Sequence, residues 1–456
     1  MRTARSTGAI SGSRVAFGLT LVVWVLSAGI ARAQVFRTTS EGLNVGHFVL
    51  YPSVAFEYTD DDNIFYESRE LPGDQIIKSG VRIIRPRILM DLPFRANRVR
   101  WVYSPVYRDY TSKSFDQAQR ISHFFDFEAT HLGPVFSMRA SDHLVLGTVE
   151  LQEVDRGGEA VFGTTPFRSS TTEGELTLNM GARNGISFLP VYTAVTFDDS
   201  KSASFLGYSR KQVELRFQHT VSLPSLLYAF YSFDDTHQQR EQVLFGKVSY
   251  GARTAGVGLR RSLNQEVVTS LNAGYKVIDF TGGSRSNFAG PVFDANATWQ
   301  LGDATVLAMT AGHQAYQSFY VNNNYYVDTE LRLHLTHQIG HNVFWDSSIA
   351  YTNNHYADKL DISVTPETPP SQDLNADGRI DVYESLQPSV GRRRRDHVYH
   401  AEIGAGWQIS RTLRVFIGYN SDRRRSNVEQ VVSGETIDPF DYSVNRVLFR
   451  LEAGWQ

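Results

Sequence analysis

Most of the chain alternates between apolar and polar residues, one position at a time. Successive side chains of a β-strand point to opposite faces, so this period of two predicts strands with one apolar and one charged face. The final segment illustrates the pattern, with Val447, Phe449, Leu451, Ala453 and Trp455 on one face and Arg446, Arg450 and Glu452 on the other. The pattern recurs from residue 49 onward and predicts an all-β chain.

Eighteen such segments can be counted, most of them 11 to 16 residues long. They cover residues 49–59, 79–91, 98–110, 119–131, 134–149, 168–181, 184–198, 208–221, 225–238, 248–263, 266–280, 288–301, 304–318, 325–339, 342–357, 396–409, 412–424 and 442–455. Strands of soluble sandwiches average about 5–6 residues, whereas membrane-spanning strands need roughly 9–11. The predicted fold is a transmembrane antiparallel up-and-down β-barrel of about 18 strands, or about 16 if two weak segments merge.

The connections alternate in length. Tight turns follow the even-numbered segments, as at Gly302-Asp303 and Gly340-His341, and longer polar loops follow the odd-numbered ones. Bacterial outer-membrane barrels combine short periplasmic turns with long external loops in this way. Aromatic residues also cluster near the segment ends, which is typical of the girdles at the two membrane interfaces. The final strand, with Trp455 next to the last residue, resembles the assembly signal of such barrels.

The N-terminal residues are organised like a secretory signal. A basic leader containing Arg2, Arg5 and Arg14 is followed by the apolar run Val15–Ile30 and by Ala31-Arg32-Ala33. The alternative, a membrane anchor, needs roughly 20 apolar residues, more than this run provides. We therefore predict a signal peptide over 1–33, a short periplasmic segment over 34–48 and a barrel over 49–456. The predicted location is the bacterial outer membrane.

The composition narrows the function classes. The 45 basic and 48 acidic residues nearly balance, which argues against a nucleic-acid-binding protein. The chain has no cysteine, so disulfides, thiol catalysis and cysteine-ligated metals are excluded.

The charged faces of the strands would line the barrel lumen. The parity of each strand assigns to this lining Arg85, Arg87, Arg100, Arg216, Arg332, Arg414, Arg446, Arg450, Asp126, Glu128, Glu330 and Glu402. Opposed charges on neighbouring strands fit the wall of a wet pore. A sharper hypothesis is selectivity for anionic solutes, set by the arginines of the second and third strands. The alternative is that these residues are only solvated wall charges.

The longest predicted loop, at about 358–395, contains a metal-binding pattern. Residues 373–384 fill the twelve positions of an EF-hand calcium loop, with Gly378 at the sharp turn. The predicted oxygen ligands are Asp373, Asn375, Asp377, the backbone carbonyl of Arg379, Asp381 and Glu384. Prolines on both sides leave no room for the long helices of a true EF-hand. We predict a Ca²⁺ site that orders this loop; the alternative is an acidic turn that binds nothing.

Two basic runs, Arg392–Arg395 and Arg423–Arg425, flank the hairpin formed by the last long segments before the final strand. The hairpin would bring both runs to the same external rim. Arginine pairs with phosphate through two hydrogen bonds, so contact with lipopolysaccharide is one interpretation. A solvated rim is the other.

The stretch from Tyr51 to Phe65, YPSVAFEYTDDDNIF, resembles the opening of the putative β-barrel porin 2 family, in which a proline-serine strand leads into an aspartate-asparagine turn. Members of that family are often linked to exopolysaccharide export. The resemblance implies an outer-membrane conduit, with a polysaccharide as one candidate substrate, and it implies no catalytic residues.

Three functions follow from these observations. The first is an outer-membrane channel, either porin-like or a conduit for polysaccharide export that works with separate periplasmic partners. The second is a non-conducting structural or adhesive barrel in the outer-membrane lipid. The third, an outer-membrane enzyme, is disfavoured because neither G-x-S-x-G nor H-E-x-x-H occurs. We predict that the protein is not an enzyme. The sequence carries no signal for an oligomeric state.

Overall fold

The chain forms one antiparallel sheet that closes into a barrel of eighteen long strands. The computed structural model describes residues 42–64, 66, 76–112, 120–147, 166–197, 207–222, 224–238, 249–262, 266–281, 287–318, 325–359, 393–428, 430–432, 435–437 and 440–455. The barrel strands are β2 (Phe48–Asp61), β3 (Ser79–Phe94), β4 (Asn97–Tyr110), β5 (Ile121–Leu132), β6 (Phe136–Gly147), β7 (Phe167–Met180), β8 (Asn184–Phe197), β9 (Tyr208–Ser222), β10 (Ser225–Gln238), β11 (Ser249–Ser262), β12 (Val267–Thr281), β13 (Phe288–Leu301), β14 (Thr305–Gln317), β15 (Tyr325–Ile339), β16 (Val343–Lys359), β17 (Arg393–Ser410), β18 (Leu413–Ser426) and β21 (Tyr442–Gly454). Among the described residues there is no helix long and apolar enough to cross a membrane.

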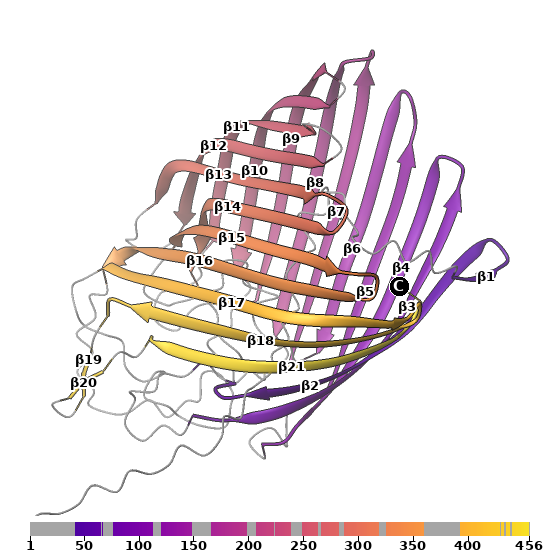
Figure 1. Cartoon of the computed structure of the whole chain (residues 1–456). Helices are drawn as coiled ribbons and strands as arrows, with labels where there is room; N and C mark the ends of the chain where they lie inside the picture. The colour runs from indigo at the N-terminus through magenta and orange to yellow at the C-terminus, as the bar shows by residue number, and fades with distance from the viewer. Residues whose placement is uncertain are drawn as a thin grey trace, which may run out of the picture.

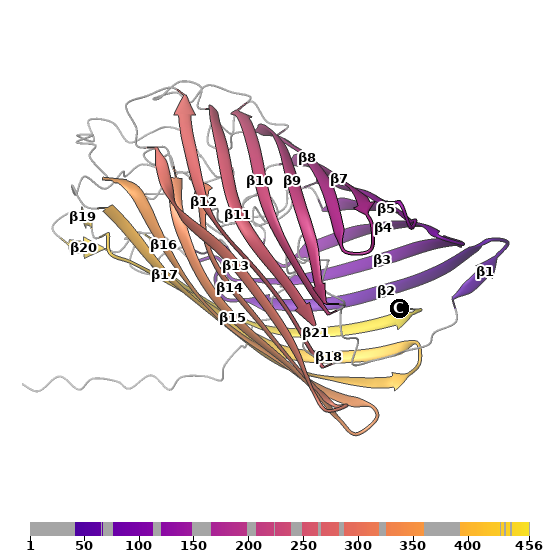
Figure 2. The same ribbon diagram turned by 90° about the horizontal axis from the view of Figure 1, so that it is seen from above.

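The barrel architecture confirms the predicted fold. Each of the eighteen predicted segments corresponds to one strand, and every strand end lies within three residues of the predicted one. Strands of the near and far walls cross at a steep angle, because the strands of a closed barrel tilt against its axis (Figure 1). Viewed from above, the strands follow one another around the wall in chain order, from β2 through β12 and back through β21 (Figure 2).

Short turns connect the strands at one end of the barrel. Gly181, Gly302 and Gly340 each adopt a positive φ, at 78°, 66° and 67°. Glycine tolerates this left-handed conformation without steric cost, which explains its use in the tight turns that the sequence predicted. We call this the short-turn end and the opposite one the long-loop end.

Three short strands were not predicted. β1 (Leu43–Val45) lies in the segment assigned to the periplasm, and β19 (Gln430–Val432) pairs with β20 (Glu435–Ile437) between β18 and β21. Each has three residues, too few for a period of two to stand out from its surroundings. β1 projects beside β2 at the short-turn end (Figures 1 and 2).

The barrel closes where the first long strand meets the last. β2 pairs with β21 from Asp61↔Arg446 to Ser53↔Gly454. Beyond that point the β2 edge would be unpaired, and β1 takes over with Leu43↔Leu50 as its first pair. The small strand therefore protects a sheet edge that would otherwise be open.

The wall is interrupted at one place. β13 and β14 pair from Leu301↔Thr305 to Phe293↔His313, and the pairing then stops, although both strands continue toward the long-loop end. Side chains replace the lost ladder: the Gln314 amide donates to the Phe293 carbonyl at 3.3 Å, and Lys276 Nζ donates to the Ala315 carbonyl at 2.8 Å. At this split between β13 and β14, the first carbonyls that lose their backbone partners therefore accept hydrogen bonds from side chains.

Two apolar clusters lie toward the long-loop end. The larger is contributed by β3 to β8 and by residues between β2 and β3, and it contains Ile64, Ile77, Val81, Ile83, Val106, Phe124, Val145, Phe167, Val195 and Phe197. The smaller joins Ala252, Ile278, Phe288 and Val292 of β11 to β13 with Ala315 of β14. The smaller cluster spans the split, so β14 packs onto its neighbours through side chains where the ladder is missing.

Candidate functional site: the charged inner face

The two faces of the barrel wall differ sharply in chemistry. One face exposes large apolar side chains, such as Phe56 at 45% and Phe449 at 45% of their full surface. The residues between them carry charge, and Glu57 is buried although it is ionisable. In a closed barrel only the inner face crowds its side chains together, so the charged face is the inner one.

The strand register places all twelve predicted lining residues on this inner face. They lie in line with buried Glu57 through the pairs Ala55↔Arg85, Asp91↔Arg100, Arg100↔Glu128, Val102↔Asp126, Ser187↔Arg216, Thr310↔Arg332, Gly312↔Glu330, Ser348↔Glu402, Gln408↔Arg414, Asn420↔Arg446, Phe416↔Arg450 and Ser53↔Arg87. Their contribution to a pore remains a prediction, but their common face is observed.

One ladder of alternating charge crosses the closure near its middle. Glu57 of β2 lies between Arg85 of β3 at 3.6 Å and Arg450 of β21 at 3.1 Å. Arg450 also reaches Glu452 at 3.6 Å, and Glu452 reaches Arg414 of β18 at 3.6 Å. The ladder therefore joins β3, β2, β21 and β18 through charges of opposite sign, which stiffens the wall where the ends of the chain meet.

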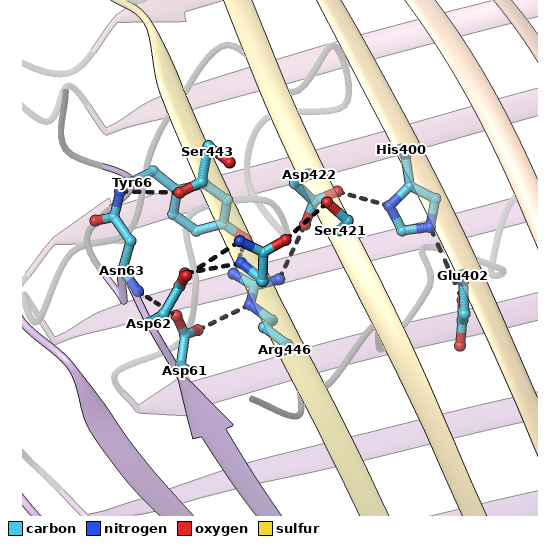
Figure 3. A network of polar contacts seen from close by, with 11 residues as sticks. Asp61, Asp62, Asn63, Tyr66, His400, Glu402, Ser421, Asp422, Ser443 and Arg446 are labelled. Atoms are coloured by element: carbon cyan, nitrogen blue, oxygen red, sulfur yellow. Dashed lines mark hydrogen bonds and ion pairs between the residues drawn. The ribbon is translucent and has the colours of Figure 1, made fainter. Parts of the chain in front are cut away.

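A second network crosses the closure closer to the long-loop end (Figure 3). Arg446 Nε donates to Asp61 Oδ2 at 2.8 Å, and its Nη1 donates to Asp422 Oδ2 at 3.1 Å. The other Asp422 oxygen lies 2.6 Å from His400 Nδ1, and His400 Nε2 lies 3.8 Å from Glu402. Four strands, β2, β21, β18 and β17, are thus linked through one guanidinium.

The aspartate-asparagine turn after β2 is part of this closure. Asp62 accepts from the backbone and side-chain amides of Asn445 at 2.8 and 3.1 Å. Asn63 is fully buried and donates to the Ser443 carbonyl at 3.5 Å. Tyr66, just beyond, lies under the Arg446 guanidinium at 4.7 Å and receives a hydrogen bond from it. The motif that carries the family resemblance therefore binds the last strand.

Aromatic rings on the inner face support several arginines. Phe344 lies against the backbone at Gly406, where an added Cβ would fall 2.0 Å from the ring. Arg414 stacks over the other side of Phe344 at 5.6 Å. Tyr228 repeats the arrangement, with Gly258 beneath it and Arg216 5.1 Å above it. Glycine lets each ring lie flat on the wall, and each ring then holds a guanidinium in place by cation–π attraction.

Six further predicted lining residues form local pairs. Arg332 Nε lies 2.9 Å from Glu330, and Glu128 lies 2.7 Å from Arg139. Asp126 lies 2.5 Å from His143, and Arg100 lies 4.0 Å from Asp91. Arg216 pairs with Glu214 of the same strand. The inner face therefore places opposite charges next to one another, and these six lining residues each have an oppositely charged or basic partner nearby.

The predicted lining set did not include Asp61, Asp422 or His400. Each has the parity of the charged face within its strand, so continuing the alternation toward the strand ends would have found them. Their mutual contacts could not have been found this way, because they join strands far apart in the sequence.

The predicted calcium loop, residues 373–384, lies outside the described residues, as does the predicted signal peptide. Within the described ranges, no group of three or more His, Asp or Glu side chains is arranged to hold a metal ion. The chemistry that the inner face supports is therefore ionic and hydrogen-bonding contact with a hydrated solute.

A closed barrel with an apolar outside and a charged inside is the architecture of a porin-like channel of the outer-membrane type. Residues 252–438 match the model of the family described as putative beta-barrel porin 2, which confirms the family that the sequence resembles. The match lies downstream of the Tyr51–Phe65 stretch on which the resemblance was based, so two separate parts of the chain point to the same family.

Solved structures similar to this chain include three outer-membrane proteins. OpdK of Pseudomonas aeruginosa is 9% identical, with 89% of this chain and 99% of that chain covered and a TM-score of 0.43. OccAB3 of Acinetobacter baumannii is 8% identical, with 90% and 100% covered and a TM-score of 0.45. FauA of Bordetella pertussis, an alcaligin receptor, is 11% identical, with 89% and 76% covered and a TM-score of 0.39. No curated protein matches the chain.

Proposed function

We propose that this porin-like barrel is a water-filled conduit for a hydrophilic polymer, a polysaccharide, across the outer membrane. The observation that carries the proposal is the inner face, where charged pairs run across neighbouring strands in a fold with an apolar exterior. Paired charges leave a wall that is strongly hydrated but weakly biased in sign. Such a wall would let a long polar chain slide without binding it tightly at any one point.

Ion conduction is the first test. The purified barrel in a planar lipid bilayer should give stable single-channel currents. A barrel that inserts but stays silent would overturn the channel proposal and favour the structural or adhesive alternative. We propose no enzymatic role. The presence or absence of single-channel current therefore distinguishes the channel from the structural or adhesive barrel.

The neighbouring residues Arg332 and Glu330 provide a matched pair of variants for the lining. They point to the same face of β15, and their atoms are 2.9 Å apart. In a conducting barrel, Arg332→Gln should shift the reversal potential toward cation selectivity, and Glu330→Gln should shift it toward anion selectivity. If neither substitution moves the reversal potential, the permeating ions do not pass these residues.

Polymer transport needs a separate readout. Acidic and neutral oligosaccharides of increasing length, added on one side, should interrupt the ionic current for times that grow with chain length. Small sugars should produce no resolved interruption. Equal interruption by monosaccharides would indicate a small-solute porin in place of a polymer conduit. In the cell, export would require separate periplasmic partners to supply the polymer.

We also propose that Ca²⁺ orders the loop between β16 and β17. The support is the sequence pattern of Asp373, Asn375, Asp377, Arg379, Asp381 and Glu384, in which all ligand positions of a calcium loop are filled. At the external surface, millimolar Ca²⁺ would occupy even a weak site. Its role would be structural, outside the lumen wall.

A further inference from the structure

The two basic runs are divided by the strand alternation into two sets. β17 and β18 pair with Val398 opposite Arg424 and His397 opposite Arg425, so the runs lie at the same long-loop end, as the sequence predicted, but are offset along the two strands. Alternate arginines point to opposite faces of the wall. Arg394 and Arg424 share the inner face, and Arg393, Arg395, Arg423 and Arg425 share the outer one.

The inner pair has a structural role. Arg394 is 1% exposed and makes two hydrogen bonds to Asp396, at 2.9 and 2.5 Å. Its guanidinium also stacks on the rings of Phe440 at 3.7 Å and Tyr356 at 4.6 Å. Arg424 is 2% exposed and lies 3.8 Å from the same carboxylate. Both charges are therefore buried and already paired.

The outer four are different. All are exposed, and in the described part of the chain no carboxylate forms an ion pair with any of them. Their backbone positions are fixed by Asn427, whose Oδ1 accepts from Arg395 N at 2.7 Å and whose Nδ2 donates to the Arg393 carbonyl at 3.0 Å. Four positive charges thus stand together on an ordered strand end without internal compensation.

An aromatic belt lies on the same outer face and extends from the level of Arg423 toward the middle of the barrel. Tyr399 is 46% exposed, and Tyr419 and Tyr351 are each 37% exposed. Tyr351 OH lies 2.8 Å from His397 Nδ1, and the two rings stack at 6.0 Å. Exposed tyrosines mark the level where acyl chains meet headgroups, because the ring is apolar and the hydroxyl is polar.

The arginines begin level with Tyr399, which is opposite Arg423, and continue past it toward the long-loop end. Arg395 is four residues past Tyr399, and Arg423 is four residues past Tyr419. At a rise of about 3.3 Å per residue, these steps correspond to about 13 Å along the strands. The same face also carries exposed Ile403, which is opposite Tyr419, and exposed Ile417 closer to the short-turn end, and both suit acyl chains. The arrangement therefore matches an amphiphile with an anionic headgroup.

We propose that Arg393, Arg395, Arg423 and Arg425 form an external site for a phosphorylated lipid of the outer leaflet, of the lipopolysaccharide type. Each guanidinium can hold a phosphate through two parallel hydrogen bonds, which distinguishes arginine from lysine at such sites. The two adjacent strands, about 4.8 Å apart, present the four guanidiniums on one face in a staggered row, with Arg423 and Arg425 opposite Tyr399 and His397 and with Arg395 opposite Asn427. The acyl chains lie along Tyr399, Tyr419 and the apolar surface below them. The site is independent of conduction through the lumen.

Binding of lipid A to the whole purified barrel in detergent tests the proposal, with native mass spectrometry as the readout. The probes are lipid A with its phosphates, the same lipid A without them, and inorganic phosphate. The phosphorylated form should bind at least tenfold more tightly than the dephosphorylated form. The quadruple variant R393Q/R395Q/R423Q/R425Q should lose that difference.

A matched control removes four other exposed, outward-facing basic side chains near the long-loop end, spread over β3, β7, β9 and β11: Arg82→Gln, Arg168→Gln, Lys211→Gln and Arg253→Gln. It should bind phosphorylated lipid A as the unmodified barrel does. Both variants must retain the barrel, seen as heat-modifiable migration on gels. Equal binding of the two lipid A forms, unchanged binding by the cluster variant, or equally tight binding of inorganic phosphate would each overturn the proposal.

Discussion

Arg446 of the last strand donates to Asp61 of the first long strand at 2.8 Å, and this contact closes the barrel on its inner side. The two residues are opposite each other in the register, and both side chains are more than nine-tenths buried. Arg446 also holds Asp422 of β18, so one guanidinium ties the closure to the strand beside it. Backbone hydrogen bonds alone would hold the first and last strands together without selecting one register. The charge contacts between residues far apart in the sequence favour one specific register of the closing strands.

Removal of this guanidinium should weaken the whole barrel. Arg446→Ala leaves Asp61 buried without a counter-charge and leaves Asp422 with His400 as its basic partner, and we expect a loss of about 3–5 kcal/mol in unfolding free energy. Urea unfolding from lipid vesicles, followed by tryptophan fluorescence, measures it. Arg139→Ala is the control, because its pair with Glu128 is about one-third exposed on both sides and should cost under about 1 kcal/mol. Equal losses in both variants would contradict a special role for the closure.

The interruption between β13 and β14 predicts a difference in cross-linking. The chain has no cysteine, so engineered pairs report without background. Asn296→Cys with Thr310→Cys occupies a register pair and should form a disulfide under mild oxidation. Val292→Cys with Gln314→Cys would be opposite if the ladder continued, but it lies past the last pair and should cross-link far more slowly. Comparable rates of disulfide formation by the two pairs in native membranes would show that β13 and β14 remain paired as far as the long-loop end.

The close approach of Phe344 to Gly406 predicts a large effect from one methyl group. Gly406→Ala places a Cβ about where the ring lies, 2.0 Å from its Cζ, so the ring must leave the wall and Arg414 loses its support. We expect destabilisation of about 1–3 kcal/mol, typical of overpacking. Gly312→Ala is the matched control on the same face, since an added Cβ there would meet nothing within 4 Å. Unfolding midpoints of the two variants compare them directly, and indistinguishable midpoints would argue against the ring platform.

Calcium should protect the long loop between β16 and β17. In limited proteolysis of intact cells, millimolar Ca²⁺ should slow cleavage within residues 370–390, and a chelator should restore it. Asp373→Asn combined with Glu384→Gln removes two ligand carboxylates and should abolish the protection. Ser371→Ala, just outside the ligand positions, should leave it unchanged. Cleavage that is equal with and without Ca²⁺ in the unmodified protein would refute the site.

The strands themselves were predictable because their signal is local. In β17 and β21, the alternation of apolar and polar residues over about a dozen positions identifies the two faces of the strand. The alternation is strict because a barrel of this kind has lipid on its outer side and water on its inner side. β1 escaped prediction because three residues carry no period, and its place is set by an edge that exists only once β21 has ended at Gly454.

The site was predictable only in part. Parity located Arg446, Arg450 and Glu402 on the inner face, but not their partners. Asp61 and Arg446 are 385 residues apart, and no local pattern encodes which strand closes on which, or that Asp422 and His400 complete the network.

By itself, the sequence determined the class of fold, the ends of the long strands to within three residues and the side of the wall on which each charge lies, because these follow from side-chain order over a few residues. The tertiary structure alone decided which charges meet at the closure, that β13 and β14 separate, and that two of the six described arginines at the long-loop rim are buried while four are exposed on the outer face. Those features depend on the closing of one sheet into a barrel, which brings together residues that share no sequence neighbourhood.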